Sequence, residues 1–186
     1  MAGATGLDVF LFCATEREDM IEDVPETARR AFENHGSVVQ TAERFEITTT
    51  VFDGFVTASE GPKWKHTYTV SVYVPTLDAA ATEVIGPAVL DGWRDTFERR
   101  LEDAPKATRA SVELVDFDIE EIDEELQITY SFEWGNERKA TEIAKTFVEY
   151  VEGTYVEGLI PGYEYEEPVS DLITEASDTG QSGPPL

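Results

Sequence analysis

The sequence has few of the residues that build crosslinks, metal sites and phosphate contacts. It contains one cysteine, Cys13, two histidines and five lysines among 186 residues. A single cysteine excludes an internal disulfide and a cysteine-based zinc site, and it fits a reducing, intracellular setting. Two histidines cannot by themselves supply the three or four ligands of a zinc site. We therefore assign no metal residue and no cofactor from the sequence.

A long apolar run is also missing. The run at residues 9–13 (VFLFC) is far shorter than the roughly 20 residues that cross a bilayer, and no basic residue precedes it as in a signal peptide. Acidic residues follow it, and then Met20. We interpret residues 1–19 as a doubtful N-terminal extension, and one hypothesis is that translation starts at Met20 rather than Met1. The intact mass of the native protein distinguishes the two starts.

Positive charge is scarce, because 39 acidic residues face 14 basic ones for a net charge of −25. Such a charge destabilises a compact fold by self-repulsion in dilute salt, whereas molar salt shortens the Debye length to about 3 Å and screens it. The composition therefore predicts a salt-adapted, cytoplasmic protein. It disfavours nucleic acid, which needs basic clusters, and it disfavours anionic membrane surfaces.

Catalytic motifs are absent as well. No G-x-S-x-G elbow and no phosphate-binding glycine loop occurs, and no carboxylate pair stands out among 39 candidates. Residues 116–125 form an acidic cluster whose Asp-x-Asp-x-Glu opening resembles a calcium loop. Glu121 stands where an EF-hand requires glycine, so we favour a solvated hairpin. No catalytic residue is assigned, and an enzyme is disfavoured without being excluded.

The stretch 136–165 is the clearest element of the sequence. Asn136 is a suitable N-cap, and apolar residues then recur at steps of three and four on one helix face. The helix is predicted to end at Gly153 or at Gly158. Tyrosines are dense at its end, and two interpretations are open. The rings pack the helix onto a sheet, or an exposed patch binds a partner; the patch residues are Tyr155, Ile160, Tyr163 and Tyr165.

Other segments alternate between helix and strand patterns. We predict helices over 25–34 and 86–103 and strands over 45–50, 55–58, 63–74, 112–119 and 126–134. Asp53-Gly54 is a hairpin-turn signal, and a change of facing at Val115-Asp116 indicates a bulge. The order α-β-β-β-α-β-β-α predicts one α+β domain over 22–168, with a mostly antiparallel sheet and helices on one face. Residues 170–186 are predicted to be a disordered acidic tail.

Several motifs resemble an uncharacterised family of conserved hypothetical proteins from halophilic archaea, a domain of unknown function. They are Asp91-Gly92-Trp93, the run 98–105 (ERRLEDAP), Trp134-Gly135-Asn136 and the segment 147–162. The resemblance spans about residues 22–168 and implies a halophilic source, with no active site to transfer. The element order also resembles the type III secretion chaperone-like fold, an analogy at the level of fold alone.

Two functions of different classes follow from these observations. The first is a chaperone- or adaptor-like interaction module that binds a protein partner or forms a homodimer, with an apolar patch left exposed around Tyr155, Ile160 and Tyr163. The second is a small-molecule binder or enzyme with a pocket between sheet and helices. Candidate pocket residues are Trp64, His66 and Arg94.

Overall fold

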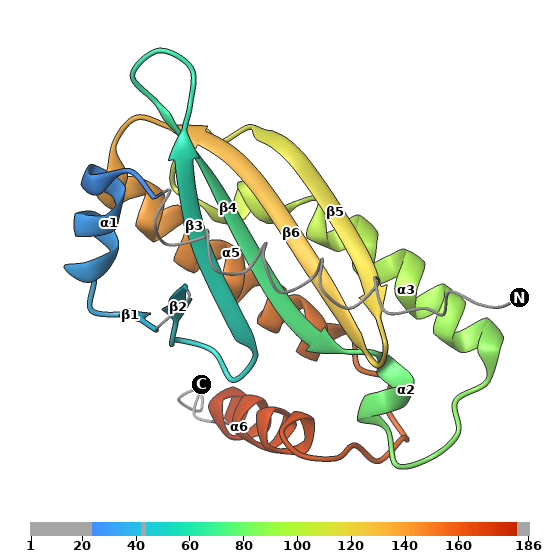
Figure 1. Cartoon of the computed structure of the whole chain (residues 1–186). Helices are drawn as coiled ribbons and strands as arrows, with labels where there is room; N and C mark the ends of the chain where they lie inside the picture. The colour runs from blue at the N-terminus through green and yellow to red at the C-terminus, as the bar shows by residue number, and fades with distance from the viewer. Residues whose placement is uncertain (1–23, 42–43, 182–186) are drawn as a thin grey trace, which may run out of the picture.

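The computed structural model describes residues 24–41 and 44–181, with side chains described to residue 177. The expected extension at residues 1–19 lies outside the described residues. Six antiparallel strands form one sheet in the order β1-β2-β3-β4-β6-β5 (Figure 1). The elements are α1 (Glu26–Glu33), β1 (Val38–Gln40), β2 (Phe45–Ile47), β3 (Asp53–Glu60), β4 (His66–Pro75), α2 (Leu77–Ala80), α3 (Pro87–Leu101), α4 (Ala104–Ala107), β5 (Leu114–Ile122), β6 (Glu125–Trp134), α5 (Glu137–Gly158) and α6 (Val169–Gln181).

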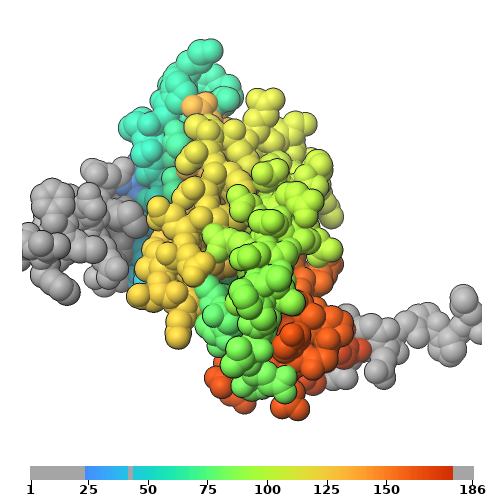
Figure 2. All heavy atoms as spheres, turned by 90° about the vertical axis from the view of Figure 1, so that its right-hand side faces the viewer, coloured from blue at the N-terminus to red at the C-terminus, as the bar shows by residue number. Residues whose placement is uncertain are grey.

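The sheet buries one face against the helices, so the predicted α+β class with helices on one face is confirmed. In β4 the alternate residues Tyr68, Val70, Val72 and Val74 are buried, as the period of two in a strand requires. In Figure 1, α3 and α5 lie behind the sheet, α1 lies beside its β1–β2 end and α6 lies below. Figure 2 shows the edge strand β5 and its neighbour β6, in yellow, beside α3 in light green.

Helix α5 is the element on which the sheet packs. Asn136 caps it as predicted, because its side-chain oxygen accepts a hydrogen bond from the Lys139 amide at 2.9 Å. Of the two predicted ends, the structure has the later one, at Gly158. The ring of Phe147 lies 5.0 Å from that of Tyr130 and 5.5 Å from that of Phe132 on β6. This aromatic layer joins helix and sheet.

The predicted bulge is confirmed, since the register of β5 against β6 shifts between Leu114 and Asp116. The predicted turn at Asp53-Gly54 is wrong. Both residues belong to β3, where Gly54 pairs with Ile47 of β2 and Val72 of β4. The acidic cluster at residues 116–125 forms the predicted hairpin between β5 and β6, and the chain turns at Asp123, which has a φ of +58°. The described residues include no group of three or more His, Cys, Asp or Glu side chains arranged to hold a metal ion.

The prediction of a disordered tail is wrong for residues 170–181, where the structure has α6. Its apolar side chains at Val169, Leu172 and Ile173 have helical spacing, and the first two are buried. The segment before it is held by a bridge between Tyr165 and Ala81. The polar composition of the tail obscured this short stripe. None of the described helices has both the length and the apolar character that crossing a membrane requires.

Glu152 connects α5 to the loop between β2 and β3. Its carboxylate accepts hydrogen bonds from the Val51 amide at 2.6 Å and the Phe52 amide at 3.4 Å. Burial raises the pKa of Glu152 above its ordinary value of 4.5, and the two amides only partly oppose this. The folded state therefore binds this proton more tightly than the unfolded state. The resulting stabilisation is present below about pH 4.5 and is lost as the pH rises through the folded pKa.

Replacing Glu152 with glutamine is therefore expected to leave the melting temperature unchanged or higher at neutral pH. The amide oxygen still accepts from Val51, while the cost of burying a charge is gone. The difference from wild type should shrink on acidification, because the protonated Glu152 of the wild type is then neutral, as glutamine is in the variant. Melting curves recorded from neutral pH to about pH 4 measure this, with exposed Glu157→Gln on the same helix as the control. A lower melting temperature of E152Q at neutral pH would contradict the assignment.

Candidate functional site

A cleft lies between α1 and the start of α5. Its volume is about 930 Å³, within the range of pockets that bind small molecules. It is lined by Thr27, Arg30, Ala31, Asn34, His35, Gly36, Asn136, Glu137, Arg138, Lys139 and Glu142. The two helices that form the walls are held in position, because Ala28 and Phe32 of α1 are fully buried in the core and Asn136 caps α5.

The charge of the cleft differs from that of the whole chain. Three cations, Arg30, Arg138 and Lys139, face two carboxylates, Glu137 and Glu142, in a protein of net charge −25. Arg30 pairs with Glu26 of its own helix at 2.7 Å. No ion pair involves the side chain of Arg138 or Lys139 among the residues that the structure describes. These two cations can therefore bind an anionic group.

His35 braces the two walls of the cleft. Its Nδ1 accepts a hydrogen bond from the Ser37 amide at 3.3 Å, which leaves the proton on Nε2, and Nε2 lies 3.0 Å from the Glu142 carboxylate. Both ring nitrogens are thus engaged. This geometry positions α1 against α5 and leaves neither nitrogen to act as a general base.

His66, at the start of β4, lies close behind the cleft. Its Nε2 is 3.0 Å from Thr27 Oγ1 and 3.8 Å from a Glu137 carboxylate oxygen. Its Nδ1 is enclosed and has no hydrogen-bond partner within the described structure. The proton is best assigned to Nε2, where two acceptors are within reach. The histidine thus supports Thr27 and Glu137, which line the cleft.

An exposed tryptophan lies beside the cleft. Trp64 is 72% exposed, in the loop between β3 and β4 that extends beyond the sheet in Figure 1. Its indole rests on Gly135, where an added Cβ would lie 1.6 Å from the ring. Because Gly135 precedes Asn136, the ring sits next to the cleft lining. Lys65 of the same loop is 3.9 Å from Glu133.

The prediction that Tyr155 belongs to an exposed patch at the end of α5 is wrong. Tyr155 is fully buried and lies among the rings of Phe52, Trp93 and Phe97. Ile160, Tyr163 and Tyr165 are partly buried against the core. The Tyr165 hydroxyl accepts from the Ile160 amide at 2.9 Å and donates to the Ile160 carbonyl at 3.1 Å, and its burial raises the Tyr165 pKa. The rings pack the helix end, as the other interpretation has it.

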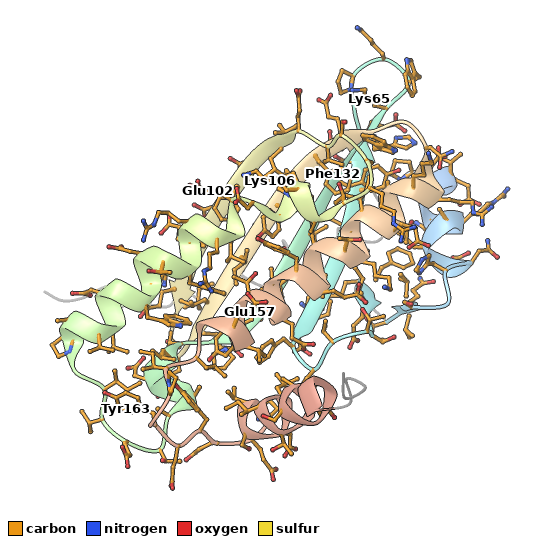
Figure 3. All side chains as sticks on the ribbon, turned by 180° about the vertical axis from the view of Figure 1, so that it is seen from behind. Lys65, Glu102, Lys106, Phe132, Glu157 and Tyr163 are labelled. Carbon is orange, nitrogen blue, oxygen red and sulfur yellow. The ribbon has the colours of Figure 1, made fainter. Side chains whose placement is uncertain are left out.

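The three candidate pocket residues do not converge. Trp64 and His66 lie near the cleft, whereas Arg94 lies on α3, 3.3 Å from the Glu121 carboxylate and 3.4 Å from the Ile119 carbonyl. Figure 3 shows Lys65 of the Trp64 loop and Tyr163 at opposite ends of the molecule. The candidate partner residues and candidate pocket residues therefore belong to different regions.

Sequence reasoning missed the cations of the cleft. A signal was present, because Arg138-Lys139 stands as an adjacent basic pair in a chain with only 14 basic residues. The pair falls in the first turn of α5, where acidic residues are the favoured type. The helix dipole therefore does not favour this basic pair.

Comparisons with known proteins identify the family and add no relative of known activity. No curated protein and no solved structure matches the chain. The sequence model of a family of unknown function, DUF5813, matches residues 28–175. The matched segment contains most of α1, the whole sheet, α5 and the first half of α6, and so it includes every residue of the cleft lining except Thr27. The chain belongs to the DUF5813 family.

Proposed function

We propose that this protein is a non-enzymatic, chaperone- or adaptor-like module that binds an acidic segment of a partner protein in the α1–α5 cleft. The observation that carries the proposal is the pair of cations, Arg138 and Lys139, which form no ion pair with any residue that the structure describes, in a strongly anionic chain. Opposite charge across an interface selects partners and speeds their association. The engaged ring nitrogens of His35 favour binding over catalysis.

Trp64 supplies the second part of the surface. Aromatic side chains are enriched at protein interfaces and dominate their binding energy, and this one is held in place by Gly135. In the salt-rich cytoplasm that the composition predicts, screening within about 3 Å leaves only direct ion pairs effective. A partner segment that combines carboxylates with an apolar side chain would use both features.

A small anionic molecule is the second candidate, favoured by the volume of about 930 Å³. Pockets for small ligands bury most of the ligand surface with a few placed polar groups. Such a ligand would bind to Arg138 and Lys139 without needing Trp64. The dependence on Trp64 therefore separates the two candidates.

Reversing both cations, Arg138→Glu with Lys139→Glu, is expected to weaken binding of a glutamate-rich peptide carrying one phenylalanine by about tenfold or more. Tenfold corresponds to about 1.4 kcal/mol. Fluorescence anisotropy of the labelled peptide in about 1 M potassium chloride measures it. The matched control, Arg99→Glu with Lys106→Glu, makes the same charge change outside the cleft and should bind as wild type does.

Trp64→Ala is the second arm of the experiment. Weaker peptide binding in this variant supports the protein-segment proposal, whereas unchanged binding favours a small anion. Equal losses in both double variants would show a nonspecific charge effect and overturn the site. The homodimer remains a prediction, which sedimentation equilibrium of the wild-type protein tests.

A further inference from the structure

The side of β3, β4, β6 and β5 that turns away from α3 and α5 forms an open face. In Figure 1 this face is turned to the viewer, and none of the described helices lies in front of it. In β4, Thr69 and Ser71 point to this side and are half-buried, whereas Val70 and Val72 point to the helices and are fully buried. Because one face of an antiparallel sheet is often simply solvated, the residues on the open face decide whether it is a contact surface.

The centre of the open face carries small hydroxyl side chains and no charge. The strand registers place Thr57, Thr69 and Ser131 in one row across the sheet, and Ser71 and Thr129 side by side in the next. These five uncharged positions stand together in a chain with 39 acidic and 14 basic residues. The centre of a protein–protein interface is likewise depleted of charged residues. The middle of the open face is therefore suited to contact with another protein surface.

The two sides of the open face carry opposite charges. Asp116 and Asp118 continue the two rows onto the edge strand β5, and both are exposed. On the other side, next to β2, the guanidinium carbon of Arg44 lies 3.6 Å from the centroid of the Phe55 ring on β3. Arg44 forms no ion pair with any residue that the structure describes. A cation on one side and carboxylates on the other make the face complementary to a second copy of itself.

We propose that two copies of this chain form a homodimer in which the open faces pack against each other about a two-fold axis parallel to the strands. Such an axis places the β2 side of one copy over β5 of the other and preserves the position along the strands. Arg44 of each copy then meets the partner's Asp116 and the partner's Asp118, and the contact occurs twice, as two-fold symmetry requires. An axis in the plane but perpendicular to the strands would instead set β5 carboxylates against β5 carboxylates. The charges therefore select the parallel axis.

The area of the open face is sufficient for a dimer of modest affinity. The four strands have 8 to 10 residues each. With about 4.8 Å between strands and about 3.3 Å per residue, the face covers about 500 Å² in each copy and about 1,000 Å² in the pair. Specific interfaces begin at about this total area. We therefore expect a dissociation constant on the order of 10 μM.

The dimer is independent of the function proposed for the α1–α5 cleft, because the helices that form the cleft lie on the other side of the sheet. Each copy has a net charge of −25, so the two copies repel each other in dilute salt. The Debye length falls from about 10 Å at 0.1 M to about 3 Å at 1 M, which screens this repulsion and still allows ion pairs in direct contact. The dimer should therefore be stronger in molar potassium chloride than in dilute buffer.

The test is sedimentation equilibrium of the full chain in about 1 M potassium chloride. Arg44→Asp and Asp116→Arg each replace both symmetric ion pairs with like charges, so each should weaken the dimer by about tenfold or more. The double variant R44D/D116R exchanges the two charges and should restore the affinity of the wild type. The matched control, Arg99→Asp on the exposed surface of α3, makes the same charge change on the helix side and should dimerise as wild type does.

Recovery in the double variant also shows that the single variants fold, and Asp116→Arg, at an exposed position, keeps the test valid if Arg44→Asp unfolds. A wild-type chain that stays monomeric at the highest concentrations overturns the proposal, as do equal affinities of R44D and R99D or a double variant without recovery. If only a chain that begins at Met20 dimerises, residues 1–19 compete for the open face, and the proposal for the full chain is overturned as well.

Discussion

Replacing Tyr155 with serine is expected to lower the free energy of unfolding by about 3–5 kcal/mol, the range for truncating a large aromatic side chain in a core. The ring is fully buried, with centroids 5.1 Å from Phe52, 5.7 Å from Trp93 and 5.8 Å from Phe97. Serine leaves a cavity among these three rings. Equilibrium denaturation in urea, analysed for midpoint and slope, measures the loss.

Tyr155→Phe provides the complementary variant and is expected to leave stability unchanged or to raise it. The Tyr155 hydroxyl is enclosed and has no hydrogen-bond partner among the described residues, and burial raises its pKa. Removing a buried polar group that makes no hydrogen bond removes its desolvation cost. Only the hydroxyl is lost, so the packing of the ring is preserved.

Tyr130→Phe makes the same chemical change where the hydroxyl has a partner. The Tyr130 hydroxyl donates to the Leu101 carbonyl at 3.0 Å, so this variant is expected to lose about 1 kcal/mol. The two tyrosine variants should therefore differ in sign or clearly in size. A loss in Y155F equal to that in Y130F would contradict the assignment and indicate a bound water at Tyr155.

These expectations change how Tyr155 can be used in a binding experiment. A weaker capture of a partner by Tyr155→Ser would report a destabilised fold, because this ring is inside the molecule. Arg138 and Lys139 are exposed on α5, where substitutions usually change stability by less than about 0.5 kcal/mol. Substitutions of Arg138 and Lys139 therefore test binding without also destabilising the fold.

Most of the fold is predictable because its signals are local. The cap at Asn136, the apolar spacing along α5, the alternation in β4 and β6 and the bulge at Val115-Asp116 each depend on neighbours in the sequence. Short elements are harder, because three residues of β1 carry too little pattern to stand out. In α6 the apolar spacing is local but brief, and serine, threonine and aspartate around it resemble a disordered tail.

The candidate site depends on contacts that are far apart in the chain. Arg30 and Arg138 meet at one cleft only because α1 packs against α5, and periodicity does not predict which helices are neighbours. The position of the Trp64 ring is equally nonlocal, because the ring rests on Gly135, which is far away in the sequence. Tyr155 shows the reverse case, because a dense group of tyrosines suggested an exposed patch and tertiary packing buries its first member.

At Gly54 a local sequence signal, the Asp53-Gly54 pair, predicted a hairpin turn that the structure does not have, and the reason is physical. Asp-Gly pairs favour hairpin turns because glycine accepts positive φ, and here Gly54 lies in β3 facing α5. An added Cβ would lie 2.5 Å from Val148 Cγ1 and 2.9 Å from Cγ2. The glycine is required for the close approach of helix and strand.

Gly54→Ala is accordingly expected to lower the free energy of unfolding by about 1–3 kcal/mol, the cost of overpacking a core. Val148 is fully buried and, as a β-branched residue in a helix, has one strongly preferred rotamer, so it cannot turn away. Gly92→Ala, at an exposed position of α3 with nothing within 4 Å of its added Cβ, should instead gain up to about 1 kcal/mol of stability.

The double variant Gly54→Ala, Val148→Ala decides whether the clash is the cause. If it is, the second change removes both methyl groups that the new Cβ meets, and the double variant should be more stable than the sum of the single losses predicts. Interaction energies between contacting residues are about 0.5–3 kcal/mol. Additive losses in urea denaturation would mean that α5 does not approach β3 this closely. Helix α5 also carries Arg138, the buried Tyr155 and Gly158, which neighbours Trp93. Such a result would therefore change the expected position of each of these residues.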